Sequence, residues 1–218
     1  MKSTIFFVPS SIVFACILAL ATPARGVVLL NTYGPNGSYG LSNAGVAAKP
    51  DVTQGLAVPF DVLATSTISD ITAAITASGN FSIGIQTGVN LPIGTLFSPL
   101  LYSVRFSNPV ANVVLPGLNW TLSPGHYWLV GRPDVPWNVN DPSTVSQGFW
   151  YGSLIGKSYY SGGGAWVHPT SGSAPAALIN ATLVPGVPEP NSWALMLGGL
   201  AAVFTLLRVR TKATNTDA

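Results

Sequence analysis

The chain has 218 residues, of which 48% are hydrophobic and only 7% are charged. Charged residues make up about 25% of ordinary soluble domains, so hydroxyl, amide and backbone groups must solvate this surface. Residues 27–187 contain four basic and five acidic side chains, which excludes the basic stripe that nucleic-acid binding requires. The single cysteine, Cys16, lies near the start of the chain, so the body of the chain has no thiol for a disulfide, a nucleophile or a metal.

Residues 1–26 have the pattern of a secretory signal peptide. A basic residue precedes the apolar run 5–21, and small residues follow at Thr22 and Ala24. A charged start, an apolar middle and a small-residue end are typical of a segment that is removed after export. We expect cleavage after Ala24, with Gly26 as the alternative position. An uncleaved membrane anchor and lipid attachment at Cys16 are the competing interpretations.

Residues 27–187 show no sustained helical periodicity. Short strand-like runs separated by Gly, Pro, Asn and Ser follow one another instead. Pro59 interrupts one run, which predicts an edge or a bulge there, and residues 72–77 could instead form one helical turn. The pattern predicts an all-β fold, a β-sandwich of jelly-roll type, because two half-buried antiparallel sheets can cover each other's apolar faces. The expected strands are 27–30, 56–63, 67–76, 81–85, 100–106, 110–115, 119–122, 126–130, 149–151, 157–160, 165–168 and 178–184.

Three stretches of this body resemble the bacterial choice-of-anchor β-sandwich domains. Residues 57–60 resemble their early strand that ends in Phe, and 81–85 followed by 92–96 resemble their strand and Pro-Gly turn. Residues 122–129 resemble their Leu-x-x-Gly-x-Tyr-Trp-Leu hairpin. The resemblance covers much of residues 55–180 and implies the sandwich fold. It implies no activity, because these domains have no established common catalytic function.

No catalytic motif stands out in the chain. The metalloprotease motif, the glycine-rich phosphate loop and the Gly-x-Ser-x-Gly elbow are all missing from the sequence. Glycoside hydrolases commonly use two opposed carboxylates. Five Asp residues could supply such a pair, but no sequence feature singles one out. We therefore expect a non-enzymatic protein, with a secreted hydrolase as a further alternative.

One loop has the composition of a calcium site. Asp134, Asn138, Asn140 and Asp141 place four oxygen-bearing side chains within eight residues. Ca²⁺ prefers such hard oxygen ligands, so calcium is the one candidate cofactor. The alternative is that these residues form turns beside the neighbouring prolines.

Aromatic residues crowd the last third of the β-rich body. Trp137, Trp150, Tyr159 and Trp166 are candidate carbohydrate-binding residues, because exposed aromatic rings can stack on the flat C–H faces of sugars. Adjacent strand residues point to opposite faces, so Trp150 and Tyr151 cannot both join one platform. Ordinary packing of these rings in the core is the alternative.

The C-terminal segment is the most specific feature of the sequence. Its three parts are the motif Pro188-Glu189-Pro190, an uncharged and mostly apolar run from Trp193 to Leu207, and a basic cluster with Arg208 and Arg210. As a helix with about 1.5 Å rise per residue, the run would span roughly 22 Å, short of the roughly 30 Å core of a bilayer. The arginines should stay on the cytoplasmic side, which places the body of the chain outside.

This segment closely resembles the PEP-CTERM sorting signal. Residues 188–190 match its Pro-Glu-Pro motif, Trp193 begins the matching short span, and Arg208 and Arg210 match its terminal cluster. Asn191-Ser192 and a polar tail after the basic cluster depart from the commoner pattern. The resemblance implies processing by an exosortase, a membrane-embedded cysteine transpeptidase-like enzyme, in a Gram-negative-type envelope. It also implies association with exopolysaccharide or biofilm. A plain single-span membrane anchor is the alternative.

The sequence thus predicts a signal peptide at 1–26, a β-sandwich at 27–187 and a sorting segment at 188–218, with a transmembrane helix at about 192–207. We expect an exported, non-enzymatic protein that passes through an inner-membrane intermediate to the cell surface or extracellular matrix. Its expected partners are an exosortase-type enzyme, the inner membrane and exopolysaccharide. A carbohydrate-binding module is the alternative function.

Overall fold

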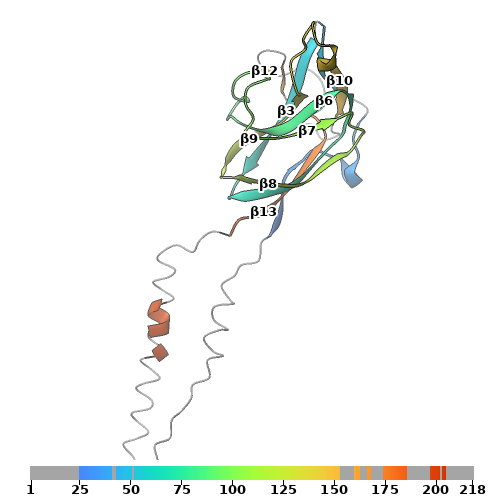
Figure 1. Cartoon of the computed structure of the whole chain (residues 1–218). Helices are drawn as coiled ribbons and strands as arrows, with labels where there is room; N and C mark the ends of the chain where they lie inside the picture. Colours follow the sequence, from blue (N-terminus) through green and yellow to red (C-terminus); the bar gives the residue numbers. More distant parts are fainter. Residues whose placement is uncertain are drawn as a thin grey trace, which may run out of the picture. The chain divides into compact units, whose positions relative to one another are not determined.

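The structure, a computed structural model, describes residues 25–40, 43–50, 52–152, 160–162, 166–167, 174–185, 197–201, 203 and 204. The chain divides into two compact units, Met1–Val184 and Pro185–Ala218. The first unit is an all-β, sandwich-like fold of two sheets, which confirms the all-β, sandwich-like part of the predicted fold class (Figure 1). The predicted signal peptide up to Ala24 lies outside the described residues.

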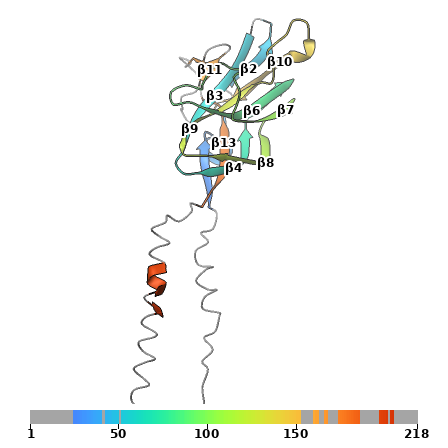
Figure 2. The same cartoon turned by 60° about the vertical axis from the view of Figure 1, so that its left-hand side comes forward.

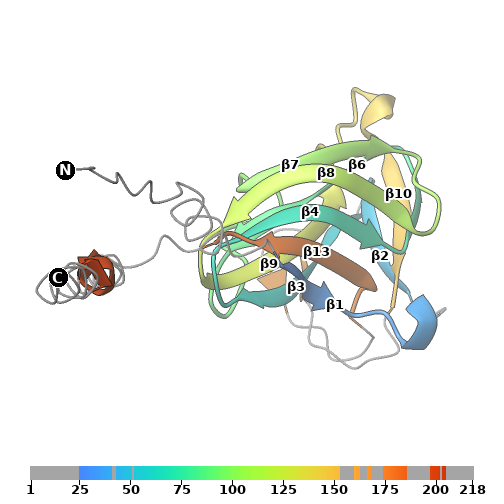
Figure 3. The same cartoon turned by 90° about the horizontal axis from the view of Figure 1, so that it is seen from below.

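The smaller sheet has four antiparallel strands in the order β1-β13-β4-β8. Their bounds are Gly26–Asn31 for β1, Ala177–Leu183 for β13, Ser66–Ala73 for β4 and Val113–Leu122 for β8. The first and last strands of the domain lie side by side (Figure 3). Gly26 is opposite Thr182, and the Leu183 amide donates a 2.9 Å hydrogen bond to the Arg25 carbonyl. The two ends of the sandwich are therefore joined by strand pairing.

The larger sheet has the order β5-β10-β2-β3-β9-β6-β7. Strand β11 pairs with β3 (Figure 2), and β12 pairs with β11. Pro59 is opposite Trp128 of β9, and within the described residues β3 has no second partner beyond Ala57. Residues 153–159, which precede the partner of Ala57, lie outside the described residues, so the edge or bulge at Pro59 stays a prediction. The bounds are Asn43–Lys49 for β2, Val52–Val62 for β3, Ile75–Ser78 for β5, Asn80–Thr87 for β6, Tyr102–Ser107 for β7, Gly125–Pro133 for β9, Ser146–Tyr151 for β10, Tyr160–Gly162 for β11 and Trp166–Val167 for β12. The described residues of the first unit also form two short 3-10 turns, Pro35–Gly37 and Pro142–Thr144.

The core lies between the two sheets. The smaller sheet contributes Ile68, Ile71 and Ile179, and the larger sheet contributes side chains such as Ile83 and Leu129, all of them fully buried. Burial of one such side chain contributes roughly 1.5–3 kcal/mol of favourable free energy. Their alternation with more exposed residues along β4 and β13 is the period-two pattern that the sequence indicated.

The predicted hairpin at residues 122–129 is wrong. The turn at Ser123-Pro124 joins β8 to β9, and these strands lie in different sheets. Leu122 at the end of β8 is opposite Ser66 of β4, whereas Gly125 at the start of β9 is opposite Val62 of β3. A turn signal fixes where the chain changes direction but does not choose the pairing partner. The burial of both apolar faces chooses it, and here it sends the two strands to opposite layers.

Three other strand predictions differ from the structure. The runs 110–115 and 119–122 form the single strand β8, in which Gly117 and Asn119 have positive φ angles of 69° and 51°. The run 67–76 breaks at Ala74, and β5 then pairs with β10 in the larger sheet, so the helical-turn alternative for 72–77 is wrong. Strand β2 was not predicted, because its sequence is rich in Gly and Ala, which are poor strand formers.

The described part of the C-terminal unit is helical. Residues 197–201, 203 and 204 form α-helix inside the predicted span of 192–207, and the rest of that span lies outside the described residues. Among the residues that the structure describes, no helix has the length and apolar content needed to cross a membrane. The motif residues Pro188, Glu189 and Pro190, together with Trp193, Arg208 and Arg210, also lie outside them.

Candidate functional site

A groove of about 450 Å³ crosses four neighbouring strands of the larger sheet, β5, β10, β2 and β3. We call it the β2–β10 groove. Directly opposed residues of paired strands point to the same face, so the strand registers arrange its lining in cross-strand rows. The rows are Thr76, Phe149 and Gly45; then Ser78, Gln147, Ala47 and Gln54; and then Lys49 and Val52.

The shape of the groove follows from the sizes of these side chains. Strand β2 contributes only Gly45 and Ala47 to the first two rows, whereas its neighbours contribute Phe149, Gln147 and Gln54. The surface is therefore low along β2 and higher on both sides. A Cβ atom added at Gly45 would meet one atom within 4 Å, Oε1 of Gln54 at 3.9 Å, which shows how open the floor is.

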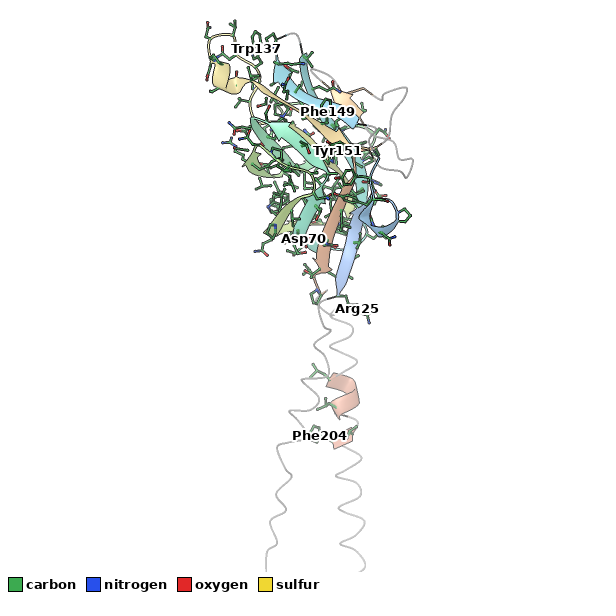
Figure 4. All side chains as sticks on the ribbon, turned by 90° about the vertical axis from the view of Figure 1, so that its right-hand side faces the viewer. Arg25, Asp70, Trp137, Phe149, Tyr151 and Phe204 are labelled. Carbon is green, nitrogen blue, oxygen red and sulfur yellow. The ribbon has the colours of Figure 1, made fainter. Side chains whose placement is uncertain are left out.

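Strand alternation around Trp150 explains why Phe149 lines this surface. Trp150 is fully buried, and its Nε1 donates a 3.0 Å hydrogen bond to the Ala176 carbonyl. Its ring covers Gly131, where an added Cβ would lie 2.4 Å from a ring carbon. Because Trp150 is held inward, its neighbour Phe149 must point outward, and the Phe149 side chain is 49% exposed. Figure 4 labels Phe149 and the next outward residue, Tyr151, along the same strand.

The lining combines an aromatic ring with uncharged polar groups and one cation. Gln54 and Gln147 carry amides, and Thr76 and Ser78 carry hydroxyl groups. Among the described residues, neither amide side chain has a hydrogen-bond partner, and the Lys49 ammonium has no ion-pair partner. Among the described residues, the lining of the groove includes no acidic side chain, and Asp51, between Lys49 and Val52, lies outside them. Such a surface can stack on a ring and bond to hydroxyl groups.

The predicted aromatic platform is wrong in two of its four residues. Trp150 and Trp166 are buried, with exposures of 0% and 6%, so neither ring can offer a face to a sugar. Trp137 is half-buried in the loop between β9 and the Pro142–Thr144 turn (Figure 4), and Tyr159 lies outside the described residues. Phe149 was missed. The alternation rule could have found it, because a buried Trp150 requires an outward Phe149.

The predicted calcium loop has its oxygen atoms committed to separate partners. Asp134 Oδ1 accepts hydrogen bonds from Ser82 Oγ at 2.6 Å and Arg105 Nε at 2.9 Å. Within the loop itself, Asn138 Oδ1 accepts from the Asn140 amide at 3.0 Å, and Asp141 Oδ1 accepts from the amide and hydroxyl of Ser143 at 3.0 and 2.6 Å. These contacts are those of the turn alternative, with Asp141 capping the short 3-10 turn. Calcium binding there stays a prediction.

The remaining described carboxylates are likewise engaged one by one. Asp61 of β3 pairs with His126 of β9, and Asp70 of β4 accepts hydrogen bonds from Asn180 and Ser69 at 2.7 and 2.8 Å. In the part of the chain that the structure describes, none of the contacts made by Asp61, Asp70, Asp134 or Asp141 joins two carboxylates. The two carboxylates of a glycoside hydrolase lie about 5–9.5 Å apart and do not touch, so the hydrolase alternative stays a prediction.

Comparison with known proteins gives no relative to guide the assignment. No protein-family model, no curated protein and no solved structure matches this chain. Two resemblances therefore stay predictions from the sequence: that of residues 188–210 to a sorting signal, and that of residues 55–180 to choice-of-anchor domains. The residues themselves carry the functional inference.

Proposed function

We propose that this chain is an exported cell-surface or extracellular-matrix protein that is delivered by a PEP-CTERM-like segment and processed there by an exosortase-type enzyme. The observation that carries the proposal is the order of the motif at 188–190, the uncharged run from Trp193 and the arginines at 208 and 210. The helical residues 197–201, 203 and 204 support it, because their large apolar side chains are exposed. The exposed fractions of Leu197, Leu200, Val203 and Phe204 lie between 41% and 64%. Exposed apolar side chains on a helix favour contact with lipid.

The pairing of β1 with β13 supports membrane delivery in a second way. Arg25, directly after the expected cleavage position, accepts a hydrogen bond from Leu183, close to the start of the sorting segment. A sandwich whose first and last strands are paired can fold while both ends of the chain are still held at one membrane. Cleavage after Ala24 would keep this bond, whereas cleavage after Gly26 would remove it together with the pair of Gly26 and Thr182.

We further propose that the sandwich is of jelly-roll type. Eight strands alternate between the layers as two Greek keys require, with six crossings along the chain order. One layer contains β1, β13, β4 and β8, and the other contains β3, β9, β6 and β7. Strands β2, β5, β10, β11 and β12 extend the second layer, and β2, β5 and β10 form most of the β2–β10 groove.

Intact-mass analysis of the protein from cells with and without the processing enzyme tests the delivery proposal. We expect the wild-type chain to lose both terminal segments, and the enzyme-free cells to retain the C-terminal one in the membrane fraction. Glu189→Ala combined with Pro190→Ala should block C-terminal processing, whereas Asn191→Ser, a matched change beside the motif, should not. A full-length precursor that is soluble in the cytosol with both termini retained would overturn the proposal.

Carbohydrate binding is a second candidate function, and the exposed ring of Phe149 in the β2–β10 groove favours it. A ring flanked by two amides and two hydroxyl groups suits a sugar, which offers C–H faces and hydroxyl groups together. The groove volume of about 450 Å³ lies in the range of about 300–1,000 Å³ that ligand sites usually have. A glycan array with the processed protein tests this function. Phe149→Ala should abolish binding and Trp137→Ala should not; the reverse result would move the site to the loop of Trp137.

A further inference from the structure

We propose that the β2–β10 groove selects an acidic polysaccharide, with the Lys49 ammonium binding a sugar carboxylate while the Phe149 ring stacks on a neighbouring sugar. This inference rests on the second candidate function and adds the charge and the minimum length of the ligand.

The charge of the groove gives the first argument. Lys49 lines it, and no acidic residue among those that the structure describes does. Two other cations of the larger sheet have partners elsewhere. Arg105 of β7 pairs with Asp134, and Arg132 of β9 donates a 2.8 Å hydrogen bond to the Ser98 carbonyl. Lys49 has no such partner within the described residues. An unpaired cation beside a neutral polar surface attracts an anionic group of the ligand. A sugar carboxylate supplies this charge while the ring hydroxyl groups and the ring faces remain available.

The strand register gives the second argument. Phe149 lies opposite Gly45 on β2, and Lys49 is four residues further along that strand. With about 3.3 Å rise per residue, the two positions are about 13 Å apart along the strand. The row of Gln147, Ala47 and Gln54 lies between them. One sugar cannot reach both ends, so the ligand must be a chain that passes from the aromatic ring over the two amides to the ammonium.

The order of the three rows also gives each one a separate role. Stacking on Phe149 and hydrogen bonds to the amides act on any sugar chain, whether charged or neutral. Lys49 alone distinguishes a carboxylated chain from a neutral one. The salt concentration should therefore change the preference for acidic chains and leave the binding of neutral chains unchanged.

The experiment compares a polyuronate with a neutral glucan of matched length by calorimetric titration of the processed protein. We expect the polyuronate to bind a few-fold more tightly at low salt, and this preference to disappear at high salt. Lys49→Gln should remove the preference by weakening polyuronate binding more than glucan binding, and Lys49→Arg should keep it. Gly45→Leu should block both ligands, because its Cβ fits at ordinary contact distance and its longer side chain fills the floor.

The outcomes separate the two levels of the argument. If both polymers bind equally, and Lys49→Gln changes neither affinity, the inference is overturned and carbohydrate binding stands. If neither polymer binds, carbohydrate binding by the groove and the inference both fail. If Lys49→Gln fails to fold, the salt dependence of wild-type binding decides, since a salt-independent preference for the polyuronate contradicts a role for the ammonium.

Discussion

Two adjacent aromatic residues on β10 have opposite environments. Trp150 is fully buried and hydrogen-bonded, whereas Phe149 is 49% exposed and lines the groove. Their chemical types are similar, so the difference comes from the strand alternation and from which face meets the core. On β10, the Trp150 ring therefore packs in the core, and the smaller Phe149 ring is the one that a ligand can reach.

This contrast gives a stability prediction. Trp150→Ala should lower the free energy of unfolding by about 3–5 kcal/mol, because it removes a fully buried ring and leaves a cavity. Phe149→Ala should lower it by less than about 1 kcal/mol, since half of that ring is already in water. Urea unfolding followed by tryptophan fluorescence and circular dichroism measures both. Equal losses for the two variants would contradict the assignment of opposite faces.

Tyr33 gives a prediction at high pH. Burial, and secondarily the neighbouring Tyr39, raise the pKa of Tyr33 well above its ordinary value, and its hydroxyl donates a 3.1 Å hydrogen bond to Asn112 Oδ1. The Tyr33 hydroxyl of the unfolded chain loses its proton at about pH 10, whereas the folded chain keeps that proton to higher pH. The contribution of protonated Tyr33 to the free energy of unfolding is therefore fully present below about pH 10 and is lost as the pH rises toward the folded pKa.

Urea unfolding measured from about pH 8 to about pH 11, on both sides of the ordinary tyrosine pKa of about 10, tests this effect. The wild type should lose stability more steeply above pH 10 than Tyr33→Phe, which has no proton at this position. Tyr33→Phe should be less stable at pH 8 by about 1 kcal/mol, because it lacks the hydrogen bond to Asn112. The same slope for both proteins would contradict the prediction.

At the scale of elements, the connection between β6 and β7 is held against the outer face of the larger sheet by side chains of the strands beneath it. Arg132 donates hydrogen bonds to the carbonyl groups of Leu96 and, at 2.8 Å, Ser98, and its guanidinium lies 5.7 Å from the centre of the Phe97 ring. Trp128 Nε1 donates a 2.9 Å bond to the Gly88 carbonyl. Burial lowers the pKa of Arg132, and Asp134 acts in the opposite direction.

Arg132→Met should release this connection without unfolding the sandwich. Methionine keeps the apolar contact but has no donor for the Leu96 and Ser98 carbonyls, so residues 88–101 should become accessible to protease. Limited chymotrypsin digestion with mass spectrometry should find new cuts between Leu91 and Leu100. Arg105→Met is the control, because Arg105 is 77% exposed and does not contact the connection. New cuts in the control alone would contradict the assignment.

At the scale of the whole molecule, the pairing of the first and last strands closes the domain. Strand β13 lies between β1 and β4, and its residues Ile179 and Ala181 are buried. The sequence places the end of the domain at residue 187, and the compact unit of the structure ends at Val184. The two boundaries differ by residues 185–187, which directly precede the Pro188 motif.

A truncation series tests this boundary. A mature chain that ends at Pro185 should keep the thermal midpoint of the processed protein, since it retains all of β13. A chain that ends at Ala176 should fail to fold, because it removes the strand that joins β1 to β4 and exposes the apolar face beneath it. Circular dichroism during heating measures both. A folded protein without β13 would contradict the sheet order.

The sequence determined those features that depend on local composition. The all-β class follows from period-two alternation and frequent turn residues, and the edge or bulge predicted at Pro59 follows from a missing backbone donor. The proposed sorting segment is also argued from local features, because its motif, apolar run and arginines are contiguous in the chain. Each of these signals acts within a few residues, so a single sequence is sufficient to predict it.

The tertiary structure decided which strands pair and which face of each strand meets the core. It sent β8 and β9 to different sheets, buried Trp150 and Trp166, and brought Lys49 and Phe149 to one groove from strands about 100 residues apart. The physical reason is that burial of apolar surface is non-directional. Composition shows that a ring or a strand will be buried somewhere, and only the packed layers choose the partner and the side.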